Sequence, residues 1–466
     1  MRRTAAVAAA KVAAGLSRRF RLGGGTALPG LVAERIDPEI VSGLAARLGQ
    51  GSVLVTGTNG KTTTARLLRS IVHAAGMETV ANREGSNMMR GIASALVESS
   101  GWNGGVEDGD HKLGVFEVDE ATVPEAAWAV RPRAVLFTNL FRDQLDRYGE
   151  VEYVADVWRK AVAAWPRLAV LVLNADDPSV ASLGKQATGP VVYYGIEDPS
   201  LGTPILEHAA DARWCTACGA ELAYAVVFYG HLGHWRCPHC GNERPTPDIS
   251  VAGVTAHDDS MSLAVRLPEG EFSTKTPVTG LYNAYNVVAA AAAASAAGLP
   301  LQAIEKGLST FTAAFGRQER LRIAGCEVQV ILAKNPAGLN QVLRTIAGGT
   351  DASKDLVFFL NDDIADGRDI SWIWDVDFEL LAGKTRAVTA SGRRAWDMAL
   401  RLKYAGLEPM MRVEAEPAEA LRSALAQVPE GQTLYVIPTY TAMLAVREIL
   451  ARRAGRGAFW EEARDG

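Results

Sequence analysis

Apolar and polar positions follow a repeating order along the first part of the chain. The apolar run Val53–Thr56 ends in the glycine-rich turn Gly57–Gly60, and residues 61–75 continue with helical character. Similar apolar runs lie at residues 115–120, 134–139 and 168–178. Because strands that alternate with helices usually pair in parallel, the pattern predicts an α/β fold with a mostly parallel sheet.

The alternation stops near residue 200 and starts again later. Residues 202–250 are rich in cysteine, glycine and histidine, and a β-rich stretch follows to about residue 276. An alanine-rich helix is expected after Asn286, and the chain is expected to leave this domain within residues 311–320. Apolar runs return at residues 328–332, 355–360, 386–391 and 434–438. They predict a second, smaller α/β domain.

Length supports a division into domains. The chain has 466 residues, of which 48% are hydrophobic and 22% charged, so it can bury more than one large core. We expect an N-terminal helical segment at residues 1–48 and a central domain at residues 49–318 that carries an insert at about 206–250. Residues 319–466 are expected to form a C-terminal α/β domain.

Charge and hydropathy narrow the possible partners. The chain has 48 basic and 53 acidic residues, a net charge of -5, and no long basic run, which argues against nucleic-acid binding. No stretch of eighteen apolar residues is present, so no transmembrane helix is expected. The N-terminus imitates a signal peptide, but Lys11 interrupts its apolar part and predicts an amphipathic helix. That helix could lie on an anionic membrane surface or pack on the protein's own core.

The segment TGTNGKTTT at residues 56–64 joins a predicted strand to a predicted helix, where backbone N–H groups and the helix dipole favour an anion. Lys61 is expected to reach the β- and γ-phosphates of a nucleotide, and Thr62 to hold Mg²⁺. A strict eight-residue phosphate loop has glycine at the position of Val55, so this turn is a shorter variant. We expect the nucleotide to contact Gly57, Thr58, Asn59, Gly60, Lys61, Thr62 and Thr63.

Several motifs in this order resemble the Mur ligases and folylpolyglutamate synthetases. They are GTNGKTT at residues 57–63, NREGSN at 82–87, FEVDE at 116–120, TNLFRDQLDRYG at 138–149, LNADDP at 173–178, GLYNAYNVVAA at 280–290 and FGR at 315–317. The resemblance covers most of residues 50–340 and implies a Mur ligase-type central domain. It implies that ATP phosphorylates a carboxylate, and that an amine then displaces the phosphate to give an amide.

The resemblance also implies roles for single residues. Glu117 resembles the magnesium-binding glutamate of the family, so Mg²⁺ is expected on Thr62 and Glu117. Asn283 and Asn286 resemble asparagines that face the adenine, although either could instead cap a helix. Arg317 resembles an arginine that contacts the nucleotide.

Three departures from the family pattern argue against ordinary amino-acid addition. Gln144 stands where the family usually has histidine, and only Arg159 and Lys160 lie near the position of a modified lysine. The usual Asp-Tyr-Ala-His at the entry of the last domain is replaced by residues 331–334, Ile-Leu-Ala-Lys. The carboxylate that contacts the ribose is therefore missing, while Lys334 could bind phosphate or lie on the surface.

Two Cys-x2-Cys pairs, Cys215 with Cys218 and Cys237 with Cys240, flank residues 219–236. Four thiolates at this spacing predict a zinc ribbon, and a site closed by four protein ligands is structural. Three histidines nearby could replace a cysteine or lie in solvent, namely His231, His234 and His239. A disulfide framework would fit poorly with a cytoplasmic ATP-dependent enzyme. The fifth cysteine, Cys326, has apolar neighbours and is expected to be buried.

The ribbon, LAKNPAGLN at residues 332–340, DGRDISWIWD at 366–375 and IPTYTAM at 437–443 together resemble the MurT family. With these motifs the resemblance covers nearly the whole chain. It implies a cytoplasmic heterodimer with a GatD-type glutaminase, which the C-terminal domain contacts and which releases ammonia from glutamine. Asp369 is implied to be the aspartate that orients the partner's Cys-His pair. A solvated acidic loop, or a helix start capped by Asp369, is the alternative.

These implications combine into one expected activity, that of an ATP-dependent carbon-nitrogen ligase in which Lys61, Glu117 and Asp369 are catalytic. The substrate is expected to be lipid II or another peptidoglycan precursor, whose D-isoglutamate becomes D-isoglutamine through an acyl phosphate. ATP, Mg²⁺ and Zn²⁺ are the expected cofactors, and any membrane contact is expected to be peripheral. The alternatives are a ligase that adds an amino acid and a non-catalytic, nucleotide-gated scaffold.

Overall fold

The structure is a computed structural model that describes residues 1–19, 27–83, 85–143, 151–165, 169–207, 210–257, 260–312, 317–323, 325–348 and 353–453. The chain divides into two compact units. The first contains Met1–Phe141, Val151–Leu206 and Asp211–Phe311, and the second contains Arg142–Glu150, Glu207–Ala210 and Thr312–Gly466. The expected boundaries at residues 48/49 and 318/319 stay predictions.

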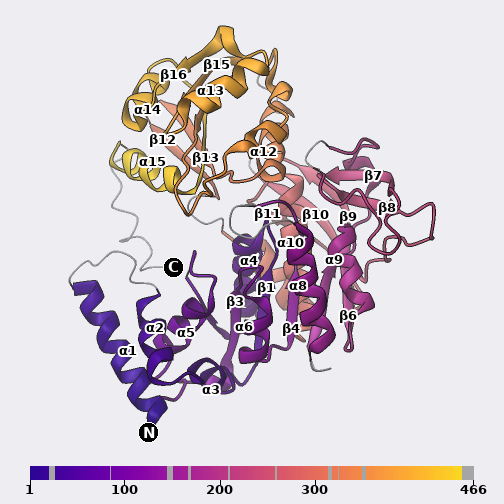
Figure 1. The fold of residues 1–466 in the computed structure, drawn as a ribbon, viewed down its shortest axis with the longest axis vertical. Helices are drawn as coiled ribbons and strands as arrows, with labels where there is room; N and C mark the ends of the chain where they lie inside the picture. The colour runs from indigo at the N-terminus through magenta and orange to yellow at the C-terminus, as the bar shows by residue number, and fades with distance from the viewer. Residues whose placement is uncertain are drawn as a thin grey trace. The chain divides into compact units, whose positions relative to one another are not determined.

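Within its described residues, the first unit is built on a nine-stranded sheet with the order β11-β10-β9-β6-β5-β4-β1-β3-β2 (Figure 1). The strands are β1 (Ser52–Thr56), β2 (Glu78–Ala81), β3 (Lys112–Glu117), β4 (Ala134–Phe137), β5 (Val170–Asn174), β6 (Val191–Ile196), β9 (Ile249–Ala256), β10 (Met261–Leu267) and β11 (Gly270–Thr276). Pairing is parallel from β2 to β9 and antiparallel among β9, β10 and β11. The expected α/β class is confirmed.

Helices cover this sheet because its central strands are apolar on both faces. Every residue of β1 and β4 is buried, which explains their continuous apolar runs. The α-helices among the described residues of the unit are α1 (Arg2–Arg19), α2 (Leu28–Ile36), α3 (Ile40–Ala45), α4 (Lys61–Ala74), α5 (Met89–Glu98), α6 (Val123–Val130), α8 (Val151–Ala164), α9 (Pro178–Ser182), α10 (Leu281–Ala296) and α11 (Leu301–Ser309). Helix α4 packs against α10 and α11.

The N-terminal helix α1 forms as expected and packs on α2 of the same unit. Its buried face includes Ala6, Val7 and Ala10, while Val12 and Leu16 are exposed. One face of the helix therefore belongs to the protein's own core. In the described residues, no helix combines the length and the apolar character that crossing a membrane requires.

The cysteine-rich insert contains an antiparallel hairpin of β7 (Ala223–Tyr229) and β8 (Leu232–Arg236). A small core beneath it includes Cys215, Leu222, Trp235 and Cys237. The expected β-rich stretch after the insert is β9 to β11.

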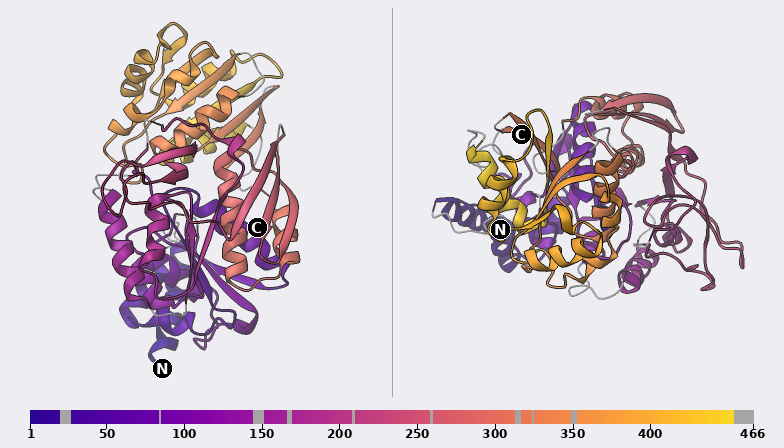
Figure 2. Two further views of the ribbon diagram at one scale, coloured as in Figure 1. Left: turned by 90° about the vertical axis from the view of Figure 1, so that its right-hand side faces the viewer. Right: turned by 90° about the horizontal axis from the view of Figure 1, so that it is seen from above.

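The second unit is a smaller α/β layer structure (Figure 2). As far as the structure describes it, six strands form a sheet with the order β12-β13-β17-β14-β15-β16, in which β12 is antiparallel to β13 and the other pairs are parallel. The elements are β12 (Arg317–Ile323), β13 (Cys326–Ile331), β14 (Lys354–Phe359), β15 (Thr385–Ser391), β16 (Met411–Val413), β17 (Thr433–Pro438), α12 (Pro336–Gly348), α13 (Ala395–Tyr404), α14 (Pro417–Leu425) and α15 (Tyr440–Arg453).

Alternation along β14 divides this unit into two cores. Leu356 and Phe358 join the core that includes residues of α12 and α13, whereas Val357 and Phe359 join the core that includes residues of α14 and α15. Successive side chains of a strand point to opposite faces, so one buried strand supports both layers. Cys326 is 2% exposed in the second of these cores, which confirms that it is buried.

Candidate active site

The phosphate loop connects the end of β1 to the first residue of α4. Gly57 and Gly60 have φ angles of 127° and 87°, which favour glycine. A Cβ atom at Gly57 would lie 2.1 Å from the Thr138 hydroxyl, and one at Gly60 would lie 2.1 Å from Oδ1 of Asn286. Both glycines are therefore required by close neighbours as well as by backbone conformation.

The segment that follows β4 forms hydrogen bonds with this loop. The Asn139 carbonyl accepts a hydrogen bond from the Thr58 N–H at 2.9 Å, and the Asn139 side chain accepts one from the Asn59 N–H at 2.8 Å. The Thr138 hydroxyl donates to the Asn59 carbonyl at 2.8 Å. Thr138 and Asn139 stand in the quoted TNLF motif, but the sequence did not predict their contact with the loop.

Lys61 lies over the loop in a buried ion pair. Its Nζ is 2.9 Å from Oε1 of Glu120, and each side chain is only 9% exposed. The same ammonium group donates to the carbonyls of Gly57 and Thr58. The Trp158 indole donates to the Glu120 carbonyl at 2.8 Å and fixes the position of that residue. Glu120 stands in the quoted FEVDE motif, but the sequence did not predict its contact with Lys61.

Thr62 and Glu117 meet beside the start of α4. The Thr62 hydroxyl donates to Oε2 of Glu117 at 2.8 Å. The Asn82 side chain accepts from the Glu117 N–H and donates to the Glu117 carbonyl, each at 2.9 Å, and so fixes the end of β3. Hydroxyl and carboxylate oxygens are ligands that Mg²⁺ prefers. The donor set therefore fits the expected magnesium ion.

The two asparagines of α10 lie next to the same loop. The Asn286 amide donates to Oδ1 of Asn283 at 2.9 Å, and the Thr64 hydroxyl donates to Oδ1 of Asn286 at 3.3 Å. Neither asparagine caps α10, because the cap is Gly280. Contact with adenine stays a prediction. The side chain of Arg317 lies outside the described residues, as does Gln144.

The four cysteines converge as the spacing predicts. Their sulfur atoms all lie within 4.8 Å of one another, with Cys215 and Cys237 buried and Cys218 and Cys240 exposed. Burial acts to raise the pKa of Cys215, but hydrogen bonds from the Ala217 N–H and other donors outweigh it and lower that pKa to about 6. The convergence of four sulfur ligands fits one soft metal ion.

The nearby histidines His231 and His234 make other contacts. His231 lies 3.2 Å from Asp177, and His234 lies 2.9 Å from the Ile196 carbonyl. Among the described residues, the group that could hold a metal ion consists of the four cysteines.

In the second unit, the segment at residues 366–375 has one buried aspartate and one exposed aspartate near its start. Asp366 is 3% exposed and accepts hydrogen bonds from the N–H and hydroxyl groups of Thr441, at the start of α15. Asp369 is exposed, and the N–H and hydroxyl of Ser371 hold the pKa of its carboxyl below the ordinary value. The bond from the Ser371 N–H spans two residues and does not cap the short helix Ser371–Asp375, whose N-cap is Ile370. A role of Asp369 toward a partner stays a prediction. Lys334 forms an ion pair with Asp143.

Comparison with known proteins identifies the family. The Mur ligase middle domain matches residues 55–213, and the MurT ligase C-terminal domain matches residues 332–443. The MurT subunit of the glutamine-hydrolysing lipid II isoglutaminyl synthase of Staphylococcus aureus (strain COL) is 34% identical over 455 residues, which are 97% of this chain and 98% of that protein. The chain belongs to the MurT family.

One further relative agrees with MurT membership, and one solved structure shows the fold. The MurT subunit of lipid II isoglutaminyl synthase from Streptococcus pneumoniae (strain ATCC BAA-255 / R6) is 33% identical over 94% of this chain and 96% of its own length. The solved structure of a pseudomurein peptide ligase type C from Methanothermus fervidus has a TM-score of 0.65 and 24% identity, and the match covers 86% of this chain and 78% of that one. The structural likeness confirms the Mur ligase-type fold.

Proposed function

We propose that this chain is the ATP-dependent synthetase subunit of a glutamine-hydrolysing lipid II isoglutaminyl synthase. It converts the α-carboxylate of D-isoglutamate in the peptidoglycan stem peptide to the carboxamide of D-isoglutamine. The observation that carries the proposal is the meeting of Lys61, Thr62 and Glu117 at one phosphate loop, in a chain related to MurT subunits over nearly its full length.

The residues of the loop have separate roles in this proposal. ATP binds with its phosphates at the N-terminus of α4, where the N–H groups and the helix dipole favour negative charge. Lys61 leaves its pair with Glu120 to contact the β- and γ-phosphates. Thr62 and Glu117 hold Mg²⁺, which neutralises phosphate charge when it is bound. Asn82 keeps the Glu117 backbone in register with the loop.

The reaction proceeds in two balanced steps. A carboxylate oxygen of the substrate attacks the γ-phosphorus of ATP, and the bond to the bridging oxygen breaks, which gives an acyl phosphate and ADP. Ammonia then attacks the acyl carbon, inorganic phosphate leaves, and the nitrogen loses a proton to give the amide. Residues 331–334 depart from the family's amino-acid-adding pattern, which supports ammonia as the amine.

The partner and the remaining cofactor complete the proposal. A GatD-type glutaminase subunit supplies the ammonia, and Asp369 orients the partner's catalytic histidine. The exposure of the Asp369 carboxylate supports this role, because its negative charge is accessible to a partner whose imidazolium it would stabilise. Zn²⁺ in the four-cysteine site has a structural role. The enzyme works in the cytoplasm, at the inner face of the membrane when its substrate is lipid-linked.

The test is the product mass after incubation with ATP, Mg²⁺, a lipid-linked muropeptide and either ammonium or glutamine. We expect the mass change of carboxyl-to-carboxamide conversion with ammonium, and with glutamine only when a glutaminase subunit is added. The variant Lys61→Met should give no product. Addition of a whole amino acid would replace the proposal with an ordinary Mur-type ligase, and ATP binding without product would favour the scaffold.

A further inference from the structure

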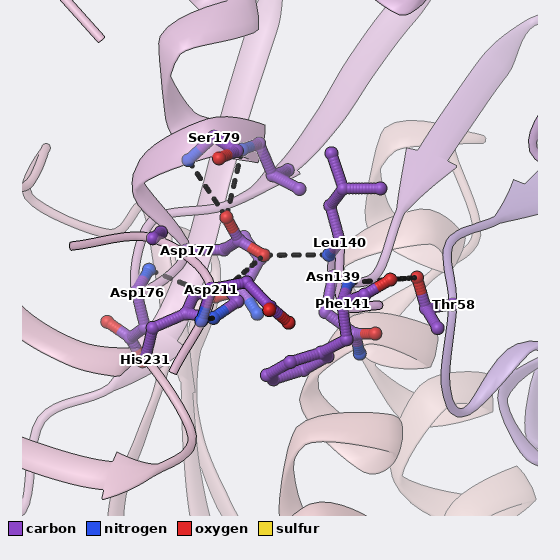
Figure 3. A network of polar contacts seen from close by, with 12 residues as sticks. Thr58, Asn139, Leu140, Phe141, Asp176, Asp177, Ser179, Asp211 and His231 are labelled. Atoms are coloured by element: carbon purple, nitrogen blue, oxygen red, sulfur yellow. Dashed lines mark hydrogen bonds and ion pairs between the residues drawn. The ribbon is translucent and has the colours of Figure 1, made fainter. Parts of the chain in front are cut away.

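His231, at the tip of the β7–β8 hairpin, lies beside Phe141, which follows the residues that support the phosphate loop (Figure 3). The Phe141 ring stacks on the Tyr229 ring with centroids 5.7 Å apart, and its centroid lies 4.4 Å from that of His231. Gly230 has a φ of 58°, and a Cβ atom there would lie 2.5 Å from the Phe141 ring. The hairpin tip therefore packs closely against Phe141, and Gly230, between Tyr229 and His231 in the sequence, permits the contact.

Hydrogen bonds join the same tip to the end of β5. His231 accepts a hydrogen bond from the Asp211 N–H at 3.3 Å on Nδ1, so its Nε2 carries the proton and donates to Asp177 at 3.2 Å. His231 and Asp177 are both 0% exposed. The oxygen of Asp177 that receives this bond also accepts from the Leu140 N–H at 2.8 Å. One buried carboxylate thus connects the hairpin to the segment after β4.

That segment in turn holds the loop. The Phe141 N–H donates to the Thr58 hydroxyl at 2.9 Å, and the hydroxyl donates to the Phe141 carbonyl at 3.1 Å. Thr58 is 3% exposed and lies between Gly57 and Asn59 of the phosphate loop. Figure 3 shows Asp177 between His231 and the Leu140 N–H, and the next residue, Phe141, bonded to Thr58.

We propose that the hairpin tip of the cysteine ribbon is a positioning element for the phosphate loop, in which His231 acts through Asp177 and Phe141 to fix Thr58. The inference rests on the proposed function only in that this loop binds ATP. Its contacts are buried and reach two successive residues of the supporting segment, Leu140 and Phe141. Because Thr58 is already fixed before the nucleotide binds, the loop loses less conformational entropy on binding.

The experiment compares variants of His231 with a matched histidine in the full chain. His231→Phe keeps a ring against Phe141 but removes the donor to Asp177, and His231→Gln retains an N–H donor at a similar reach. His234→Phe is the control, because His234 lies on the same hairpin and contacts the Ile196 carbonyl and Phe228 instead of Phe141. The measurements are the Kd for Mg·ATP by titration calorimetry, the KM for ATP, kcat and the melting temperature.

We expect His231→Phe to raise the Kd and the KM for ATP about five- to tenfold, the effect of losing one buried hydrogen bond, with little change in kcat. His231→Gln should restore the Kd to within about twofold of wild type, and His234→Phe should alter the melting temperature without altering the Kd. Equal Kd values for His231→Phe and wild type would overturn the inference.

Two further results distinguish a failure of this inference from a failure of the proposed function. If His231→Phe does not fold, Phe141→Leu decides, since it loses the ring contacts but keeps the backbone bonds to Thr58, and an unchanged Kd there overturns the inference. Wild-type protein that does not bind Mg·ATP would instead refute the proposed function itself.

Discussion

Replacement of Gly60 by alanine tests whether the phosphate loop has the shape described above. Gly60 has φ 87° and ψ -9°, and alanine in this left-handed region costs about 1–2 kcal/mol. The new Cβ would lie 2.1 Å from Oδ1 of Asn286, so that side chain must move. Its bonds with Thr64 and Asn283 would then be lost, at about 1 kcal/mol each. We therefore expect a loss of about 3–4 kcal/mol in the free energy of unfolding.

The same helix supplies the matched control. Gly76 follows the other end of α4 with φ 77°, and a Cβ there meets nothing within 4 Å. Gly76→Ala should therefore lose only the conformational part, about 1–2 kcal/mol. Urea unfolding measures both losses, and calorimetric titration measures Mg·ATP binding. We expect Gly60→Ala to weaken binding by about tenfold or more, because a displacement worth 1.4 kcal/mol already has that effect, and Gly76→Ala to bind normally.

The reasoning would be refuted by equal destabilisation of the two variants. That result would mean that the Asn286 side chain moves aside at no cost in the free energy of unfolding, and that its contact with the loop contributes nothing to stability. Normal nucleotide binding by Gly60→Ala would equally refute the claim that the shape of the loop at Gly60 matters for the phosphates.

Three other predictions follow from the sites. Glu117→Gln should raise the Mg²⁺ concentration required for half-maximal activity by about tenfold or more, measured by metal titration of the ATPase rate; an unchanged requirement would remove Glu117 from the metal site. Cys218→Ser should lower both the bound zinc measured by mass spectrometry and the melting temperature, whereas the buried thiol of Cys326 should be replaceable by serine without zinc loss. Asp369→Asn should reduce glutamine-driven amidation by at least about 100-fold and leave ammonium-driven amidation intact; equal losses would place Asp369 in another role.

Several of the strands that the sequence predicted are buried on both faces. All residues of β1, β4 and β14 are buried, so each appears as a continuous apolar run. Of the strands that were not predicted, β2 and β16 lie at sheet edges, whereas β6 lies between β5 and β9 and has three half-buried residues. β2 has only one buried residue, and β16 has three residues that are half-buried or exposed, so neither carries a clear apolar pattern.

The site residues also divide into those that the sequence predicted and those that it did not. Lys61 and the four cysteines stand in compact motifs whose spacing defines their chemistry. Asn139, Asp177 and His231 come from three separate segments, and no short motif joins them. The topology explains part of their proximity, because β1, β4 and β5 are adjacent parallel strands whose carboxyl ends meet at one edge of the sheet. Applying that rule to TNLF and LNADDP would have placed Asn139 and Asp177 beside the loop, but the hairpin contact of His231 had no such signal.

The two aspartates of the DGRD segment show how one short sequence can both anchor and present a carboxylate. Asp366 is buried and bonded to Thr441 at the start of α15, so Asp366→Asn should lower the melting temperature and also impair glutamine-driven amidation by displacing the segment. Asp369 is exposed and bonded within the protein only to its neighbour Ser371 among the contacts described above, so Asp369→Asn should leave the melting temperature unchanged. If both variants changed only stability, the segment would be a structural loop. A stability loss confined to Asp366→Asn, with amidation from glutamine reduced in both, would show that Asp366 positions the carboxylate that Asp369 offers.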